Sequence, residues 1–518
     1  MPEYLSPGVY VEEIEIGAKP IEGVSTSTAG FLGETERGPT TPQLITSWLQ
    51  FQRVYGNYFR ANAYLPYAVE GFFANGGKRC YIGRITAEDA SKASLKLTAG
   101  VDNALTGEAI GEGAGGGRIA IKVGTGTFST TDNPLFKLTV FYWKDALPDP
   151  LFDPDAQPTQ KPQPTVREDF DNVSVNSASP DWYEKRINGI SNLVTLSIQI
   201  VGDSGNTPDG PTDITALTGT DLEGTTPIAL ADYQRTDTDE PGKRKGLTAF
   251  REIDEISIVY APNSVSIIGL IGVLISHCEG LKDRFAIIDA ERGLSKISDI
   301  DPRSTNDTKY AAFYYPWVKI IDPTTNVKKS IPPGGHVAGI YARTDTERGV
   351  HKAPANEVLR GVVDLEFKIT KGEHDILNPR GVNVIRAFPG RGIRVWGART
   401  ISSDTLWKYI NVRRLFLFLE ESIDEGTQWV VFEPNDEKLW ARVRQTITQF
   451  LTRVWKDGAL MGTTPEEAFF VKCDRTTMTQ DDIDNGRLIV LIGVAPVKPA
   501  EFVIFRIAQW AGGSAVTE

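Results

Sequence analysis

Histidine is the first residue type to test for chemistry, because its imidazole can bind a metal or act as a general base. The chain has four histidines: His277, His336, His351 and His374. No two of them stand four residues apart, the spacing that places two metal ligands on one face of a helix. We therefore expect no metal site.

A glycine-rich run, residues 111–118, has the composition of a phosphate-binding loop. Such loops lead into a helix through a Lys followed by Ser or Thr, and that pair is missing here. The run therefore predicts a hairpin loop in place of a nucleotide site, and we expect no bound cofactor.

The segment Gly335-His336-Val337-Ala338-Gly339 resembles the helix start of subtilisin-like serine proteases. The nucleophile of those enzymes lies five residues before the histidine, which is Ile331 here, and Ser330 is one place off. Residues 203–205 (Asp-Ser-Gly) imitate the aspartate motif, but no His-Gly-x-His follows. We expect a subtilisin-like echo in the fold and no catalytic residue; a subtilisin-like hydrolase remains an alternative.

Composition narrows the class of protein. The 518 residues carry a net charge of −12, and 40% of them are hydrophobic, which is typical of a globular chain of several domains. A surplus of carboxylates argues against a nucleic-acid partner. The first residues lack a secretory signal and the apolar stretch 265–278 is too short to span a bilayer, so we expect cytoplasmic synthesis and no membrane insertion. The odd, widely spaced Cys80, Cys278 and Cys473 predict buried reduced thiols.

Short strands and helices alternate over residues 25–85 and again from residue 256, which predicts an α/β (α+β) multidomain fold. Between residues 90 and 245, Gly, Thr, Asp and Pro dominate. Six prolines between residues 147 and 165 exclude a helix or a central strand there. This stretch predicts a mainly β inserted domain with an exposed, extended loop.

The second α/β stretch begins with a βαβ unit. We expect strands at residues 256–261 and 284–290, joined by a helix over residues 264–279 that Gly280 ends. A further helix should run from Asn411 to Gly426.

Another helix is expected between Asn435 and Trp455. Its apolar residues recur at helical spacing: Leu439, Val443, Ile447, Phe450, Leu451 and Val454. Strands should follow at residues 467–473 and 487–494.

Both ends of the chain look like strands. Residues 501–510 are apolar on both faces, through Phe502, Val503, Ile504, Phe505 and Ile507, and they follow the stiff Pro496 and Pro499. A second such run near the N-terminus contains Val9, Tyr10, Val11 and Ile14. The two strands either pair with each other in one domain or add to a sheet of another subunit.

Longer motifs resemble one family. They are residues 7–13 (Pro-Gly-Val-Tyr-Val-Glu-Glu), 332–345 (Pro-Pro-Gly-Gly-His-Val-Ala-Gly-Ile-Tyr-Ala-Arg-Thr-Asp), 348–356, 377–383, 392–400, 409–414 and 432–435 (Phe-Glu-Pro-Asn). In this order they are similar to the sheath proteins of contractile phage tails and phage-tail-like injection particles. The resemblance covers roughly residues 1–85 and 250–510; His351 departs from it, where an aromatic residue is expected.

The resemblance implies a structural function. Sheath subunits form a homo-oligomer of stacked rings or a helical tube around an inner tube protein, between a baseplate and a terminal cap. Strands at the chain ends are exchanged between neighbours, and contraction drives the tube through a target envelope. The energy comes from a metastable extended state, in agreement with the missing phosphate loop.

With the resemblance, five parts are expected. They are an N-terminal arm (1–22), a core domain in two parts (23–89 and 246–498), an inserted outer domain (90–245) and a C-terminal arm (499–518). Lys438, Arg442 and Arg453 are candidates to face the inner tube. A static, non-contractile filament is the other alternative.

Overall fold

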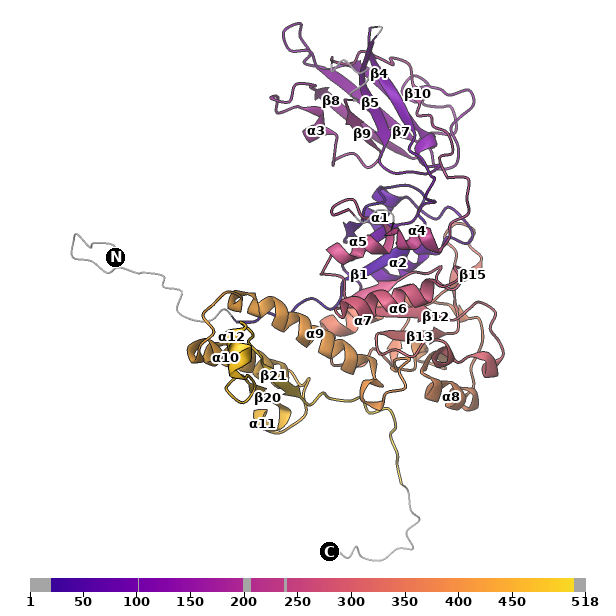
Figure 1. The fold of residues 1–518 in the computed structure, drawn as a ribbon. Helices are drawn as coiled ribbons and strands as arrows, with labels where there is room; N and C mark the ends of the chain where they lie inside the picture. The colour runs from indigo at the N-terminus through magenta and orange to yellow at the C-terminus, as the bar shows by residue number, and fades with distance from the viewer. Residues whose placement is uncertain (1–19, 101, 199–205, 237–239, 507–518) are drawn as a thin grey trace, which may run out of the picture. The chain divides into compact units, whose positions relative to one another are not determined.

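The computed structural model describes residues 20–100, 102–198, 206–236 and 240–506 (Figure 1). These residues form two compact units. The main unit contains residues 25–350 and 354–414, and the C-terminal unit contains residues 20–24, 351–353 and 415–506. Both units contain helices and strands, which confirms the mixed α/β, multidomain fold class. The five-part domain division stays a prediction.

Within the described residues, the main unit is organised by a nine-stranded sheet. In spatial order its strands are β16 (Glu357–Val358), β19 (Gly392–Val395), β18 (Val382–Phe388), β13 (Ala311–Tyr315), β12 (Phe285–Asp289), β11 (Ile258–Tyr260), β1 (Ala29–Gly33), β3 (Cys80–Arg84) and β2 (Gln43–Ile45). The six strands from β18 to β3 are parallel, and the other three join antiparallel at the edges. Because β1 pairs with β11, the two α/β stretches of the sequence build one sheet.

The predicted βαβ unit is confirmed. Strands β11 and β12 pair in parallel, and α6 (Leu270–Leu281) lies between them in sequence. The helix begins at Leu270 and not at Ser264, because Gly269 has a φ of 86° that lies outside the right-handed helical region. It continues past Gly280 and stops at Lys282, which has a φ of 65°.

Two helices of the main unit, α2 (Leu65–Ala74) and α7 (Gly334–Arg348), pack closely through glycines. A Cβ on Gly335 would lie 2.4 Å from the Cα of Ala68, and one on Gly339 would lie 2.5 Å from the carbonyl oxygen of Phe72. Helix packing therefore accounts for the glycines of the Gly-His-Val-Ala-Gly motif. The other helices of this unit are α1 (Trp48–Tyr55), α3 (Tyr183–Arg186), α4 (Leu230–Gln234), α5 (Gly246–Ala249) and α8 (Lys371–Leu377).

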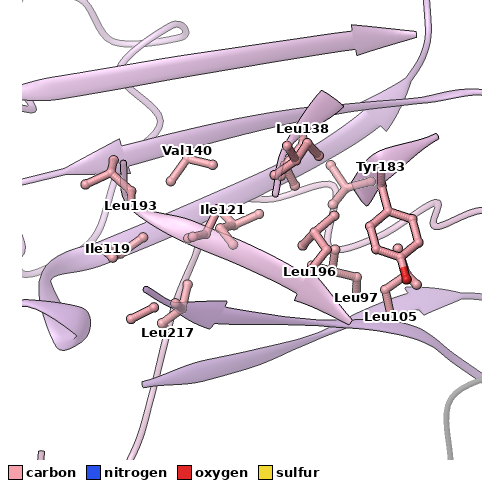
Figure 2. Close-up of a cluster of buried hydrophobic side chains, with 14 of the residues drawn as sticks. Leu97, Leu105, Ile119, Ile121, Leu138, Val140, Tyr183, Leu193, Leu196 and Leu217 are labelled. Atoms are coloured by element: carbon pink, nitrogen blue, oxygen red, sulfur yellow. The ribbon is translucent and has the colours of Figure 1, made fainter. Parts of the chain in front are cut away.

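Residues 94–216 form two antiparallel sheets with a shared apolar core. One sheet contains β10 (Thr215–Ala216), β6 (Ile119–Thr125), β7 (Phe136–Tyr142) and β8 (Val166–Val173), and the other contains β4 (Ser94–Ala99), β5 (Asp102–Ala109) and β9 (Val194–Ser197). Figure 2 shows Leu97 and Leu105 from the second sheet in one buried cluster with Ile121, Leu138 and Val140 from the first. The alternation of apolar residues along these strands fills the space between the sheets.

The proline-rich segment 147–165 contains no helix or strand, as its prolines predict. It is less exposed than expected, because Leu147 and Leu151 pack against a buried cluster that includes Trp143. Phe152 is only 4% exposed, and the Trp143 indole donates a hydrogen bond to the carbonyl of Pro162. The segment therefore covers one face of the four-stranded sheet.

A small sheet of β15 (Lys328–Ile331), β14 (Val318–Ile321) and β17 (Asp364–Leu365) completes the main unit. Helix α9 (Ile410–Thr427) crosses the boundary between the units, which falls after Arg414. The C-terminal unit also contains α10 (Glu437–Lys456), α11 (Pro465–Ala468), β20 (Phe469–Lys472), α12 (Gln480–Asp484) and β21 (Leu491–Val494).

Both long helices of this region were predictable. Helix α9 ends one residue after Gly426, and α10 begins where the Asp436 carboxylate accepts a hydrogen bond from the backbone N–H of Leu439. All six residues of the predicted apolar stripe on α10 are buried. The predicted strands appear as β20 and β21, each shorter than expected.

Candidate assembly surface

The C-terminal unit contains a two-stranded sheet with two open edges. Strands β20 and β21 pair antiparallel, with Phe469 opposite Val494 and Lys472 opposite Leu491. Within the described part of the chain, no third strand joins this pair. An open edge leaves main-chain N–H and C=O groups free for another strand.

The side chains of this strand pair, which residues 473–490 and α12 connect, are unusually apolar for their exposure. Residues 488–494 are six apolar residues and one glycine, and none of the seven is buried. Leu491 is 52% exposed, and Phe470 on the facing strand is 47% exposed. The edge strand β8 contrasts with it, because it carries Arg167, Glu168 and Asp169 and so discourages pairing with another chain. The β20–β21 pair carries a single charged residue in its strands, Lys472.

Residues 501–506 form no strand in the structure. Their apolar side chains are open to solvent: Phe502 is 67% exposed, Val503 70%, Ile504 77% and Phe505 82%. Ile507 and the N-terminal arm residues Val9, Tyr10, Val11 and Ile14 lie outside the described residues. The exchange of arm strands between subunits therefore stays a prediction.

The root of the C-terminal arm is fixed by main-chain hydrogen bonds. The N–H of Met461 donates to the carbonyl of Ala495 (2.8 Å), and the N–H of Val497 donates to the carbonyl of Ala459 (3.1 Å). The chain leaves the unit beyond Val497, where Pro499 keeps it extended.

The root of the N-terminal arm is fixed on α9 and α10 of the same unit. Ile21 is 1% exposed, and a Cβ on Gly426 would lie 2.6 Å from it. The Arg453 guanidinium donates to the carbonyl of Ile21 (2.6 Å), and the N–H of Val24 donates to the hydroxyl of Ser422 (3.1 Å). Residues 20–24 are therefore held by specific contacts and not by apolar packing alone.

Three basic residues of α10 were candidates to face an inner tube. Lys438 is exposed, and the Arg442 guanidinium lies 4.6 Å from the ring centroid of Trp429. Arg453 binds the carbonyl of Ile21 and so has a structural role inside the chain. Contact with a tube stays a prediction for all three.

His336 does not have the surroundings of a catalytic histidine. Burial against α2 lowers the pKa of His336 to about 4, and a Cβ on Gly71 would lie 2.4 Å from its Nδ1. Within the described residues this Nδ1 atom has no hydrogen-bond partner, whereas a catalytic triad needs a carboxylate there. Ser330 lies in β15 opposite Lys319, and residues 203–205 are outside the described part of the chain.

The glycine-rich run is not a hairpin loop, so that prediction is wrong. It connects β5 and β6, which belong to different sheets. A Cβ on Gly111 would lie 1.9 Å from the carbonyl oxygen of Gly38, and one on Gly115 would lie 2.7 Å from that of Glu36. The glycines allow the loop to lie directly against the segment that follows β1.

The three cysteines are buried and unpaired, as predicted. Among the described residues, no cluster of three or more His, Cys, Asp or Glu side chains could hold a metal ion. None of the described helices is long and apolar enough to cross a bilayer.

Comparison with known families gives two matches that follow each other along the chain. Residues 241–401 match the phage tail sheath protein central domain, and residues 402–509 match the phage tail sheath C-terminal domain. Together these ranges cover more than half of the 518 residues.

Curated relatives are tail sheath proteins of several phages. The chain is 25% identical to that of Vibrio phage KVP40 over 254 residues, which are 48% of this chain and 36% of the relative. It is 30% identical to that of Burkholderia phage BcepMu over 185 residues (34% and 38%), and 24% identical to that of Escherichia phage P2 over 330 residues (61% and 80%). The matches thus span little more than a third of the first two relatives.

Solved structures match over nearly the whole chain. A chain of the anti-feeding prophage helical sheath in the contracted state is 25% identical, with a TM-score of 0.57 and coverage of 98% of this chain and 99% of that one. A chain in the baseplate structure of the same particle is 26% identical, with a TM-score of 0.56 and the same coverage. These matches show that the chain belongs to the phage tail sheath protein family.

Proposed function

We propose that this chain is the subunit of a contractile sheath. Many copies polymerise around an inner tube protein, between a baseplate and a terminal cap, and contraction drives the tube through a target envelope. The particle is a phage tail or a phage-tail-like injection device, and the chain is made in the cytoplasm. The family matches and the two arm roots support this proposal.

The observation that carries the proposal is the apolar β20–β21 strand pair. Its two outer edges are open, and the same chain has an exposed apolar arm. Arm strands of neighbouring copies add to its open edges. A ten-residue strand adds about five main-chain hydrogen bonds per edge, each worth roughly 0.5–1.5 kcal/mol net. One link is therefore worth several kcal/mol, and many such links hold a sheath together while the main units repack.

We infer that the subunit is not an enzyme. The buried His336 has no triad geometry among the described residues, and the glycine-rich run serves packing. Contraction then draws on a metastable extended assembly and not on nucleotide hydrolysis. Labelling by a serine-directed fluorophosphonate that disappears with Ser330→Ala would restore the hydrolase alternative.

The experiment that tests assembly is truncation of each arm. Removal of residues 1–17 or 500–518 should leave folded subunits that form no tubes, because one partner of each strand addition is lost. Tubes of normal length from either truncation would contradict the proposal. Electron microscopy of the intact protein should resolve two tube lengths and widths; a single form would favour a static filament.

A further inference from the structure

The β18–β19 hairpin of the main unit places like charges opposite each other. Arg386 lies directly across from Arg394 in the antiparallel register, and Arg391 lies in the turn between the strands. Like charges at facing positions of two strands are destabilising. Within the described residues, none of the three arginines pairs with a carboxylate.

Aromatic rings hold these arginines at the surface. The Arg391 guanidinium lies 4.7 Å from the ring centroid of Phe388, and that of Arg386 lies 5.4 Å from the same ring. The guanidinium of Arg394 donates to the carbonyl of Asn356 (2.6 Å). The hairpin therefore presents a basic and aromatic surface whose charge is uncompensated.

The surrounding sequence is basic over a long stretch. Residues 376–403 contain five arginines and no Asp or Glu. Arg380 and Arg399 are used inside the unit, where they donate to backbone carbonyls. Arg394 also donates to backbone carbonyls, so Arg386 and Arg391 are the two arginines of the hairpin left for a partner.

An acidic segment follows in the C-terminal unit. Residues 415–437 contain seven carboxylates and no Lys or Arg: Glu420, Glu421, Asp424, Glu425, Glu433, Asp436 and Glu437. Of these, Asp424, Glu425 and Glu433 are exposed and pair with no cation in the described part of the chain. Phe432, between them in sequence, is fully exposed. The acidic segment offers both the carboxylates and the aromatic ring that a basic, aromatic surface binds.

We propose that the β18–β19 hairpin of one copy binds residues 420–437 of a neighbouring copy. This inference rests on the proposed function, because it requires copies to be packed together. The two surfaces differ, so the contact is head-to-tail and repeats from copy to copy, around a closed ring or along an open helix. The neighbour's carboxylates offset the Arg386–Arg394 repulsion, which is present in every unassembled subunit.

Cross-linking tests which carboxylates the hairpin contacts. An Arg386→Lys, Arg391→Lys variant keeps the charge and supplies amines, which a zero-length carbodiimide joins to carboxylates in direct contact. Tubes are assembled from equal amounts of ¹⁴N- and ¹⁵N-labelled variant, and the cross-linked peptides are mapped by mass spectrometry. We expect isotopically mixed pairs between the hairpin and residues 420–437. Unmixed pairs alone, pairs with other carboxylates of the chain, or pairs with the tube protein would each overturn the proposal.

Charge reversal tests whether the contact holds the sheath together. Arg386→Glu with Arg391→Glu should lower the salt concentration at which tubes fall apart, and adding Asp424→Lys and Glu433→Lys should restore it. Lys161→Glu with Lys185→Glu makes the same change of net charge at exposed positions of the proline-rich segment and α3, and it should leave the salt resistance unchanged. Unaltered salt resistance of the hairpin variant would overturn the proposal.

The outcomes separate this contact from strand exchange. Loss of the arms removes tubes at every salt concentration, whereas loss of the hairpin contact makes assembly sensitive to salt. If the unmodified protein forms no tubes, the proposed function fails. If tubes form but the cross-links are absent, only the hairpin contact fails.

Discussion

Arg414 and Asp345 form a two-point ion pair inside the main unit. The guanidinium nitrogens lie 2.9 and 2.6 Å from the two carboxylate oxygens, and the side chains are 3% and 4% exposed. The same carboxylate accepts a hydrogen bond from the hydroxyl of Thr26, and the same guanidinium donates to the carbonyl of Thr26. One buried pair thus joins α9, α7 and the segment that leads into β1.

Removal of Arg414 should be strongly destabilising. Arg414→Ala leaves the buried Asp345 carboxylate with only the Thr26 hydroxyl, and breaking a buried pair in this way costs about 3–5 kcal/mol. Arg414→Lys should cost less, because one of the two contacts can persist. Urea midpoints measure both changes. Lys243→Ala, which removes an exposed pair with Glu240, is the control and should leave the midpoint unchanged.

A charge on the β20–β21 strand pair should block assembly without unfolding the subunit. Leu491 is half exposed, so Leu491→Lys costs little in the isolated chain but places a charge where an added strand would pack. Sedimentation should find the variant as unassembled subunits. A thermal melt should give these subunits the melting temperature of the unmodified subunit. The matched control is Phe128→Lys, which should form tubes. Phe128 is a 75% exposed aromatic residue between β6 and β7. If both variants form tubes equally well, the β20–β21 strand pair is not the edge that receives an arm strand.

The stability of the main unit should depend on the ionisation of Asp289. Burial raises the pKa of Asp289 to about 7, against the hydrogen bond from the Tyr260 hydroxyl, which lowers it. Because this pKa is higher in the folded state than in the unfolded state, the folded state binds more protons between about pH 4 and 7, and stability falls as pH rises through that window. Asp289→Asn removes the titration. Between pH 5 and pH 8 the urea midpoint of the unmodified protein should therefore fall relative to that of the variant. If the two midpoints change in parallel with pH, Asp289 is not the source of the pH dependence.

Loss of the Arg453 side chain should loosen the root of the N-terminal arm. Arg453→Gln shortens the reach to the Ile21 carbonyl, so residues 20–24 should exchange amide hydrogens faster while the rest of the unit keeps its protection. Lys456→Gln, at an exposed position in the last turn of the same helix, should change neither. Unchanged exchange at residues 20–24 in the Arg453 variant would mean that Ile21 packing alone holds the root.

Local sequence patterns predicted the elements whose stability is local. The α10 stripe and the βαβ unit appear as expected, because helical spacing and buried apolar strands leave little freedom. The pairing of β1 with β11 joins residues more than two hundred positions apart, and no spacing within either strand encodes that choice. The conformation of the glycine-rich run also depends on packing. Its contact with Gly38 could not be predicted from the residues of the run itself.

The assembly surface was predicted in part. Two-faced apolar residues at 501–510 predicted a strand; residues 501–506 form none in the structure, and the rest lie outside the described residues. The apolar run of β21 has the sequence pattern of an ordinary buried strand, and only the structure shows that it is not buried.

Both arm roots lie in the C-terminal unit, although some 470 residues separate them along the sequence. In the proposed sheath, a pull on one arm would therefore reach the other through α9, α10 and residues 495–497, without passing through the nine-stranded sheet. In that arrangement the arms and the C-terminal unit would carry the tension between copies, and the nine-stranded sheet would carry none of it.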